Sequence, residues 1–207
     1  MDGTLVDSGD LHYLAWREAM QAHGRDLTRA EFDATFGQRN DTILRRLLDP
    51  AITAEDIARI GDEKEADYRA LVAARGIQPL AGALEWVRRL GAAGWRQAIA
   101  SSGPRANADT IVDALGLHGA FAALASAEDV THGKPHPEVF LVAAARVDVA
   151  PARCVVVEDA PPGIEAGRRA GMPTIGVLST HAKLEADRVV AALTDLEADA
   201  FDRLITR

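Results

Sequence analysis

Residues 154–178 read CVVVEDAPPGIEAGRRAGMPTIGVL. An apolar run at 154–157 is followed by a helix-forming segment at 163–170 and by a second apolar run at 174–178. A short apolar strand, a helix and another apolar strand in this order are typical of a parallel βαβ unit, whose strands are buried on both faces. The stretch therefore predicts an α/β protein built on a parallel sheet.

The same alternation extends toward the N-terminus as far as about residue 78. Helices are predicted at 84–90, 108–115 and 138–146, and strands at 95–100 and 121–125. We therefore expect a Rossmann-like, doubly wound parallel sheet with helices on both faces. In such sheets, ligands bind beyond the carboxyl ends of the strands.

Residues 10–76 have a different pattern, because they read as helices throughout. Apolar residues recur at helical spacing, as at Leu11, Leu14 and Ala15, and no convincing strand interrupts them. Four such segments predict a small helical bundle. We expect a core domain made of residues 1–8 and 78–207, with a helical-bundle cap domain inserted as residues 9–77.

Composition limits the kinds of partner. The chain has 207 residues and a net charge of −8, so it offers no basic field for nucleic acid or an anionic membrane surface. Cys154 is its single cysteine, which excludes an intramolecular disulfide. No apolar run approaches the length of a membrane span. We expect a cytoplasmic monomer that binds neither nucleic acid nor membrane.

Polar residues follow the strands where each one should end. Ser101-Ser102-Gly103 follows the strand at 95–100, Gly133-Lys134-Pro135 comes after the strand at 121–125, and Glu158-Asp159 follows the strand at 154–157. Each group alone could be an ordinary turn or a solvated loop. Together they predict one pocket, because the carboxyl ends of parallel strands meet at one edge of a sheet.

These residue types suit the binding and transfer of a phosphoryl group, which depends mainly on positioning and on charge neutralisation. Lys134 supplies a positive charge, and the Ser101 hydroxyl can donate to a phosphate oxygen. Glu158 and Asp159 would repel one another in a pocket unless a cation lay between them. A hard ion with oxygen ligands fits this pair, so we expect Mg²⁺.

The opening residues 1–8, MDGTLVDS, identify a family resemblance. They resemble the first motif of the haloacid dehalogenase (HAD) phosphatases, and the three groups at the strand ends resemble the other motifs in order. The resemblance implies hydrolysis of small phosphate esters, with sugar phosphates favoured, through an aspartyl-phosphate. It also implies that Asp2 is the general acid/base and that its backbone carbonyl is a further metal ligand.

In that motif the nucleophilic Asp stands two positions before the acid/base, which is ahead of Met1 here. The central strand that carries it would also precede Met1. We expect the sequence to be a shortened copy of an active enzyme. As given, it would be inactive because it lacks the nucleophile. The alternative is a non-catalytic protein that binds a phosphorylated ligand.

The helical region resembles the cap of the beta-phosphoglucomutase-like branch. This resemblance implies substrate contacts from His12, Arg39 and Lys64 in the cap, and from Ser102 and Arg105 after the second motif. A phosphohexose mutase is therefore an alternative to the phosphatase. The loop Ser102-Gly103-Pro104-Arg105 departs from the polar loop that holds a second phosphate in the mutases, which favours the phosphatase.

Overall fold

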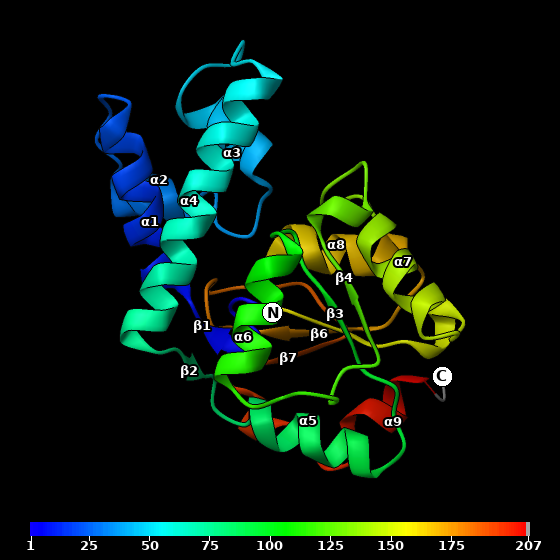
Figure 1. Cartoon of the computed structure of the whole chain (residues 1–207). Helices are drawn as coiled ribbons and strands as arrows, with labels where there is room; N and C mark the ends of the chain where they lie inside the picture. Colours follow the sequence, from blue (N-terminus) through cyan, green and yellow to red (C-terminus); the bar gives the residue numbers. More distant parts are fainter. Residues whose placement is uncertain (206–207) are drawn as a thin grey trace.

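The computed structural model describes residues 1–205, which fold into a helical part and an α/β part (Figure 1). The helical part contains α1 Gly9–Ala22, α2 Arg29–Asp33, α3 Asn40–Leu47 and α4 Ala54–Arg75. It has a hydrophobic core of its own, in which Met20, Phe32 and Leu44 are buried. The expected four helices are thus present, and α2 begins at a capping box formed by Thr28 and Glu31. The division into domains at residues 9–77 stays a prediction.

The chain passes between the two parts twice, and the two passages lie side by side. β1 Val6–Asp7 pairs antiparallel with β2 Gln78–Pro79. Val6 is fully buried at this junction. A strand pair of two residues each is too short to be recognised from sequence, and neither strand was predicted.

The α/β part contains two parallel sheets among the described residues. β3 Ala98–Ala100 pairs with β4 Ala123–Ala125, and β5 Val156–Glu158 pairs with β6 Thr174–Val177, which pairs with β7 Arg188–Val190. The surrounding helices are α5 Ala83–Ala92, α6 Arg105–Ala114, α7 Glu138–Arg146, α8 Pro161–Arg169 and α9 Ala200–Ile205. Short 3-10 turns lie at η1 Ala127–Asp129, η2 Pro151–Arg153 and η3 Leu193–Asp195. The α/β class and the parallel strands are confirmed.

The two parallel sheets are separated by an apolar cavity of about 780 Å³. Ile99 of β3 and Val156 of β5 line it, as do Leu5, Trp86 and Phe201. No described strand pairs with both β3 and β5. The sequence predicted a parallel sheet whose central strand would precede Met1, and the described strands form two separate sheets, with residues of β3 and β5 both lining this cavity.

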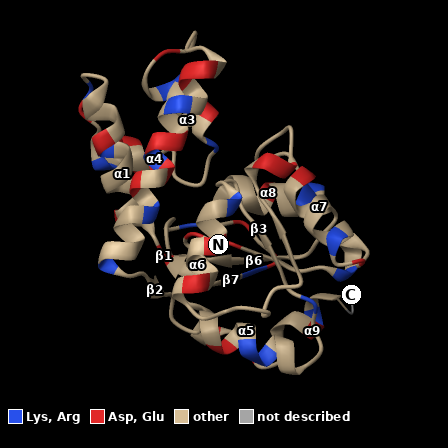
Figure 2. Ribbon diagram, viewed as in Figure 1, with Lys and Arg blue, Asp and Glu red and all other residues tan. Residues whose placement is uncertain are grey.

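The described helices carry acidic and basic residues side by side, as α5 and α7 do in Figure 2. None of the helices described is long and apolar enough to cross a membrane.

Candidate active site

Ser101 is the first residue after β3, and it is buried at 4% exposure. Its backbone N–H donates to the carbonyl of Ala125, which continues the pairing of β3 with β4. Its Oγ accepts the N–H of Gly103 at 3.1 Å. The hydroxyl hydrogen is therefore left to donate into the space beyond the strand, as a phosphate-binding serine requires.

Lys134 and Glu158 form a buried ion pair at the end of β5. The Lys134 Nζ donates to Glu158 Oε1, and Glu158 Oε2 accepts the backbone N–H of Asp159 at 3.1 Å. Burial raises the pKa of Glu158, but Lys134 outweighs it, so the net pKa is below its usual value. Gly163 in α8 faces this carboxylate so closely that a Cβ there would collide with it.

Asp159 lies next to Glu158 without a cation of its own among the described side chains. Its Oδ2 accepts the Thr180 hydroxyl at 2.5 Å, and its Oδ1 accepts Thr4 at 3.4 Å. Burial, together with the charge of Glu158, raises the pKa of Asp159 to about 6. Gly3, at a φ of 64°, leaves the space that this carboxylate occupies.

Asp2 is turned toward the helical part. Its Oδ1 accepts the Ser8 hydroxyl at 2.7 Å, lies 3.3 Å from His12 Nε2, and is 3.5 Å from the Tyr68 hydroxyl. Burial acts to raise the pKa of Asp2, but the hydrogen bonds from His12 and Ser8, together with the nearby terminal amine, lower it well below the ordinary value. In this arrangement Asp2 is therefore ionised, which is the form that accepts a proton.

His12 connects Asp2 to a buried lysine. The Lys64 Nζ lies 3.0 Å from His12 Nδ1, and the His12 ring stacks on Tyr68 with ring centres 3.7 Å apart. Burial lowers the pKa of His12 and also that of Lys64. A protonated Lys64 can only donate, so His12 Nδ1 accepts and Nε2–H donates to Asp2. The ring is thus assigned as the neutral tautomer with its proton on Nε2.

Glu65 joins this group to the α/β part. Its carboxylate accepts Lys64 Nζ and Asn40 Nδ2, each at 3.0 Å, and Asn107 Nδ2 at 2.7 Å. Because Asn107 belongs to α6 while Glu65 belongs to α4, the contact bridges the two parts of the molecule. Burial raises the pKa of Glu65, but the charge of Lys64 and the hydrogen bonds from Asn107 and Asn40 together bring the net pKa below its usual value.

These groups surround a cavity of about 70 Å³ between the helical part and the strand ends. Eight of the residues predicted from sequence line it: Asp2, His12, Lys64, Ser101, Ser102, Lys134, Glu158 and Asp159. Trp16, Phe32 and Phe36 add apolar surface from the helical part. The four motif groups thus meet at one place.

Two predicted residues are not brought into this lining. The Arg39 guanidinium donates to the Val130 carbonyl at 3.1 Å, and its Nε lies 3.6 Å from Asp41. Arg105 is half exposed and pairs with Asp129 at 3.1 Å. Their substrate-binding roles stay predictions.

Sequence reasoning missed Glu65, Tyr68, Asn107 and Thr180. Three of them lie on helices and one lies in a loop after β6, where no motif marks them. For Glu65 a signal existed: the charged pair Lys64-Glu65 lies on the same helix as buried Ile60 and Val72. Such a pair is buried only when its charges are satisfied internally.

The chain matches the profile of the haloacid dehalogenase-like hydrolases over residues 1–171. It belongs to this family. Validoxylamine A 7'-phosphate phosphatase of Streptomyces hygroscopicus subsp. limoneus is 31% identical, over 95% of this chain and 92% of its own length. Fructose-1-phosphate phosphatase YqaB of Escherichia coli is 32% identical, over 86% and 93%.

A solved structure extends the likeness to three dimensions. Beta-phosphoglucomutase from Clostridium difficile superposes with a TM-score of 0.87 at 26% identity, covering 99% of this chain and 94% of that one. The HAD chain described here is thus an enzyme of the phosphoric monoester hydrolase class with the fold of beta-phosphoglucomutase-like proteins.

Proposed function

We propose that this HAD protein is a Mg²⁺-dependent phosphatase of small phosphate esters, sugar phosphates in particular. The observation that carries the proposal is the meeting of Asp2, Ser101, Lys134, Glu158 and Asp159 at one small cavity. Its volume of about 70 Å³ is of the size of a phosphate group. Relatives named for phosphatase activity on validoxylamine A 7'-phosphate and fructose 1-phosphate support the same class of substrate.

The acidic pair fits a divalent cation. Asp159 has no positive partner among the described side chains, and its raised pKa reflects burial beside Glu158. A hard cation held by Asp159, by Glu158 and by the Asp2 carbonyl would relieve this repulsion. When bound, such an ion would neutralise charge on the phosphate oxygens.

The side chains around the cavity have separate roles in phosphate binding and proton transfer, which follow from their positions. The Ser101 hydroxyl and the Lys134 ammonium hold phosphate oxygens, and Lys134 can do so while it stays beside Glu158. Asp2 gives a proton to the leaving oxygen and later takes one from water. The proton-accepting form is the one present here, so protonation of Asp2 requires its contact with His12 to loosen.

The nucleophile belongs two positions before Asp2, by resemblance to the family motif. The decisive test supplies a strand ending in Asp at that position and measures phosphate release from a panel of sugar phosphates with Mg²⁺. The control carries Asn at the same place. Release that depends on that Asp and on Asp159 supports the proposal, whereas binding of phosphate without release identifies a non-catalytic protein.

A mutase is the second candidate, because the fold is that of beta-phosphoglucomutase. A mutase must hold two phosphate groups in one site. The two arginines suggested for this purpose, Arg39 and Arg105, point to Val130 and Asp129 in this structure. This arrangement favours the phosphatase. Isomerisation of a hexose phosphate that is activated by a bisphosphate and weakened by Arg39→Ala would favour the mutase instead.

A further inference from the structure

We propose that His132, His136 and Glu138 form a second metal site, selective for Zn²⁺ or a similar transition-metal ion and separate from the acidic pair. His132 and His136 flank Lys134 in the loop that leads into α7, and Glu138 is the first residue of that helix. Their ligand atoms lie within 4.8 Å of one another. The proposal does not depend on the phosphatase assignment, because the site is defined by metal binding alone.

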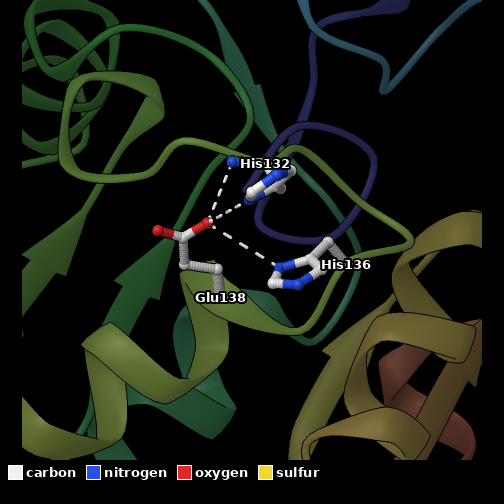
Figure 3. A group of neighbouring side chains, drawn as sticks. All are labelled: His132, His136 and Glu138. Carbon is white, nitrogen blue, oxygen red and sulfur yellow. Dashed lines mark hydrogen bonds and ion pairs between the residues drawn. The ribbon is translucent and has the colours of Figure 1, made fainter.

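The ligand atoms are spaced closely enough to bind one ion together. One carboxylate oxygen, Glu138 Oε2, faces both imidazoles: His132 Nδ1 at 3.3 Å and His136 Nδ1 at 3.7 Å (Figure 3). Three ligands about 2.1 Å from a tetrahedral zinc ion would be about 3.4 Å apart. The two spacings to Glu138 Oε2 are close to that value, and all three ligand atoms lie within 4.8 Å of one another, so side-chain rotations would complete the site.

The loop backbone holds the carboxylate in place. Glu138 Oε1 accepts the N–H of Thr131 at 3.1 Å, and Oε2 accepts the N–H of His132 at 2.9 Å. His136 is fixed by a turn in which its N–H donates to the Gly133 carbonyl at 3.0 Å. A metal ion would therefore meet a partly organised set of ligands rather than three independent side chains.

The ligand types select the metal. Two neutral imidazoles with one carboxylate suit Zn²⁺, Ni²⁺ or Cu²⁺, whereas Mg²⁺ prefers oxygen ligands alone. The acidic pair at Glu158 and Asp159 offers only oxygens. The two sites therefore differ in preference, and excess Mg²⁺ would occupy the acidic pair without competing for the histidine cluster.

The position of the cluster links it to the phosphate pocket. Lys134 stands between the two histidines, and Gly133 lies against the Arg39 side chain of the helical part. Arg39 also donates to the carbonyl of Val130 in the same loop. An ion bound here would fix the loop that presents Lys134 and that contacts the helical part.

The test is calorimetric titration of the whole chain with Zn²⁺ in excess Mg²⁺. We expect one saturable site, weakened at least about tenfold by His132→Ala, by His136→Ala and by Glu138→Gln. His118→Ala is the matched control, because His118 is an exposed histidine that also faces a carboxylate, Asp113, at 3.5 Å. It should leave Zn²⁺ affinity unchanged.

Spectroscopy of ¹⁵N-labelled histidine locates the ligands independently. Zn²⁺ should shift the Nδ1 resonances of His132 and His136 and leave those of His118 in place. The proposal is overturned by the absence of saturable binding up to about 1 mM, which would be too weak for a built site. It is equally overturned if His132→Ala and His136→Ala bind as the unaltered chain does, or if His118→Ala weakens binding as much as they do.

Discussion

Lys134 forms an ion pair with Glu158, and in the proposed function it also binds phosphate. Replacing it with Ala would leave a buried carboxylate unpaired, which costs about 3–5 kcal/mol. We expect Lys134→Ala to lower the free energy of unfolding by about that amount. Mg²⁺ should raise the free energy of unfolding of Lys134→Ala by more than it raises that of the unaltered chain. Urea denaturation with and without Mg²⁺ measures both effects.

The exposed Lys183 supplies the control for that experiment. Lys183→Ala should leave the free energy of unfolding within about 0.5 kcal/mol. If Lys134→Ala is as stable as Lys183→Ala, the Lys134–Glu158 pair does not have the role assigned to it.

Asp159 makes metal binding depend on pH. Its pKa is raised to about 6, so below that pH the carboxyl holds a proton that a divalent cation must displace. Mg²⁺ affinity should therefore be constant above about pH 7 and fall by up to about tenfold per pH unit below about pH 6. Titration calorimetry between pH 5 and 8 measures this dependence. A flat profile, or one that Asp159→Asn shares, would contradict it.

His12 controls the charge of Asp2. Without the His12 hydrogen bond, burial would dominate and the pKa of Asp2 should rise. For a hydrogen bond to a charged group of about 1.5–3 kcal/mol, the titration midpoint in His12→Asn should rise by about one to two pH units. Carboxyl ¹³C NMR of labelled aspartate reports this directly. His118→Asn should leave the Asp2 resonance unchanged, and equal shifts in both variants would refute the link.

At the scale of elements, α4 joins the two parts of the molecule through Glu65. Glu65→Gln would leave Lys64 buried without its countercharge, and we expect a loss of about 3–5 kcal/mol in the free energy of unfolding. Glu63→Gln, two residues earlier, removes an exposed partner of Arg59 and should cost less than about 1 kcal/mol. Urea denaturation of the two variants compares them. Similar losses would mean that the Glu65 contacts do not hold α4 to α6.

The elements also show where sequence patterns suffice. The helices α1 to α4 and the strands β3 to β6 follow from apolar periodicity, because each buries one face or both. β7 was not predicted, because it begins with the exposed Arg188. α9 was not predicted either, because its six residues are too few to show a helical period. The site shows the same limit. Motif residues were found at strand ends, whereas Glu65 and Asn107 join the site through a contact between distant helices, which no local pattern contains.

At the scale of the whole molecule, the cavity of about 780 Å³ is lined by residues of both β3 and β5, which no described strand joins. Apolar side chains line it from both sheets, and both strand edges face it. An apolar segment attached before Met1 should enter this cavity, pair with both strands and join the two sheets. Each apolar side chain that it buries would contribute about 1.5–3 kcal/mol.

We expect the chain extended in this way to unfold at a clearly higher temperature than the same chain extended by an equally long Gly/Ser segment. Differential scanning calorimetry gives the comparison, and hydrogen exchange at the amides of Ala100 and Val157, which point away from β4 and β6, shows whether the new strand pairs there. Protection at only one of these amides would mean that the segment extends one sheet without joining the two. If both extensions melt alike and neither amide gains protection, the cavity does not accept a strand, and the nucleophile would have no scaffold beside Asp2.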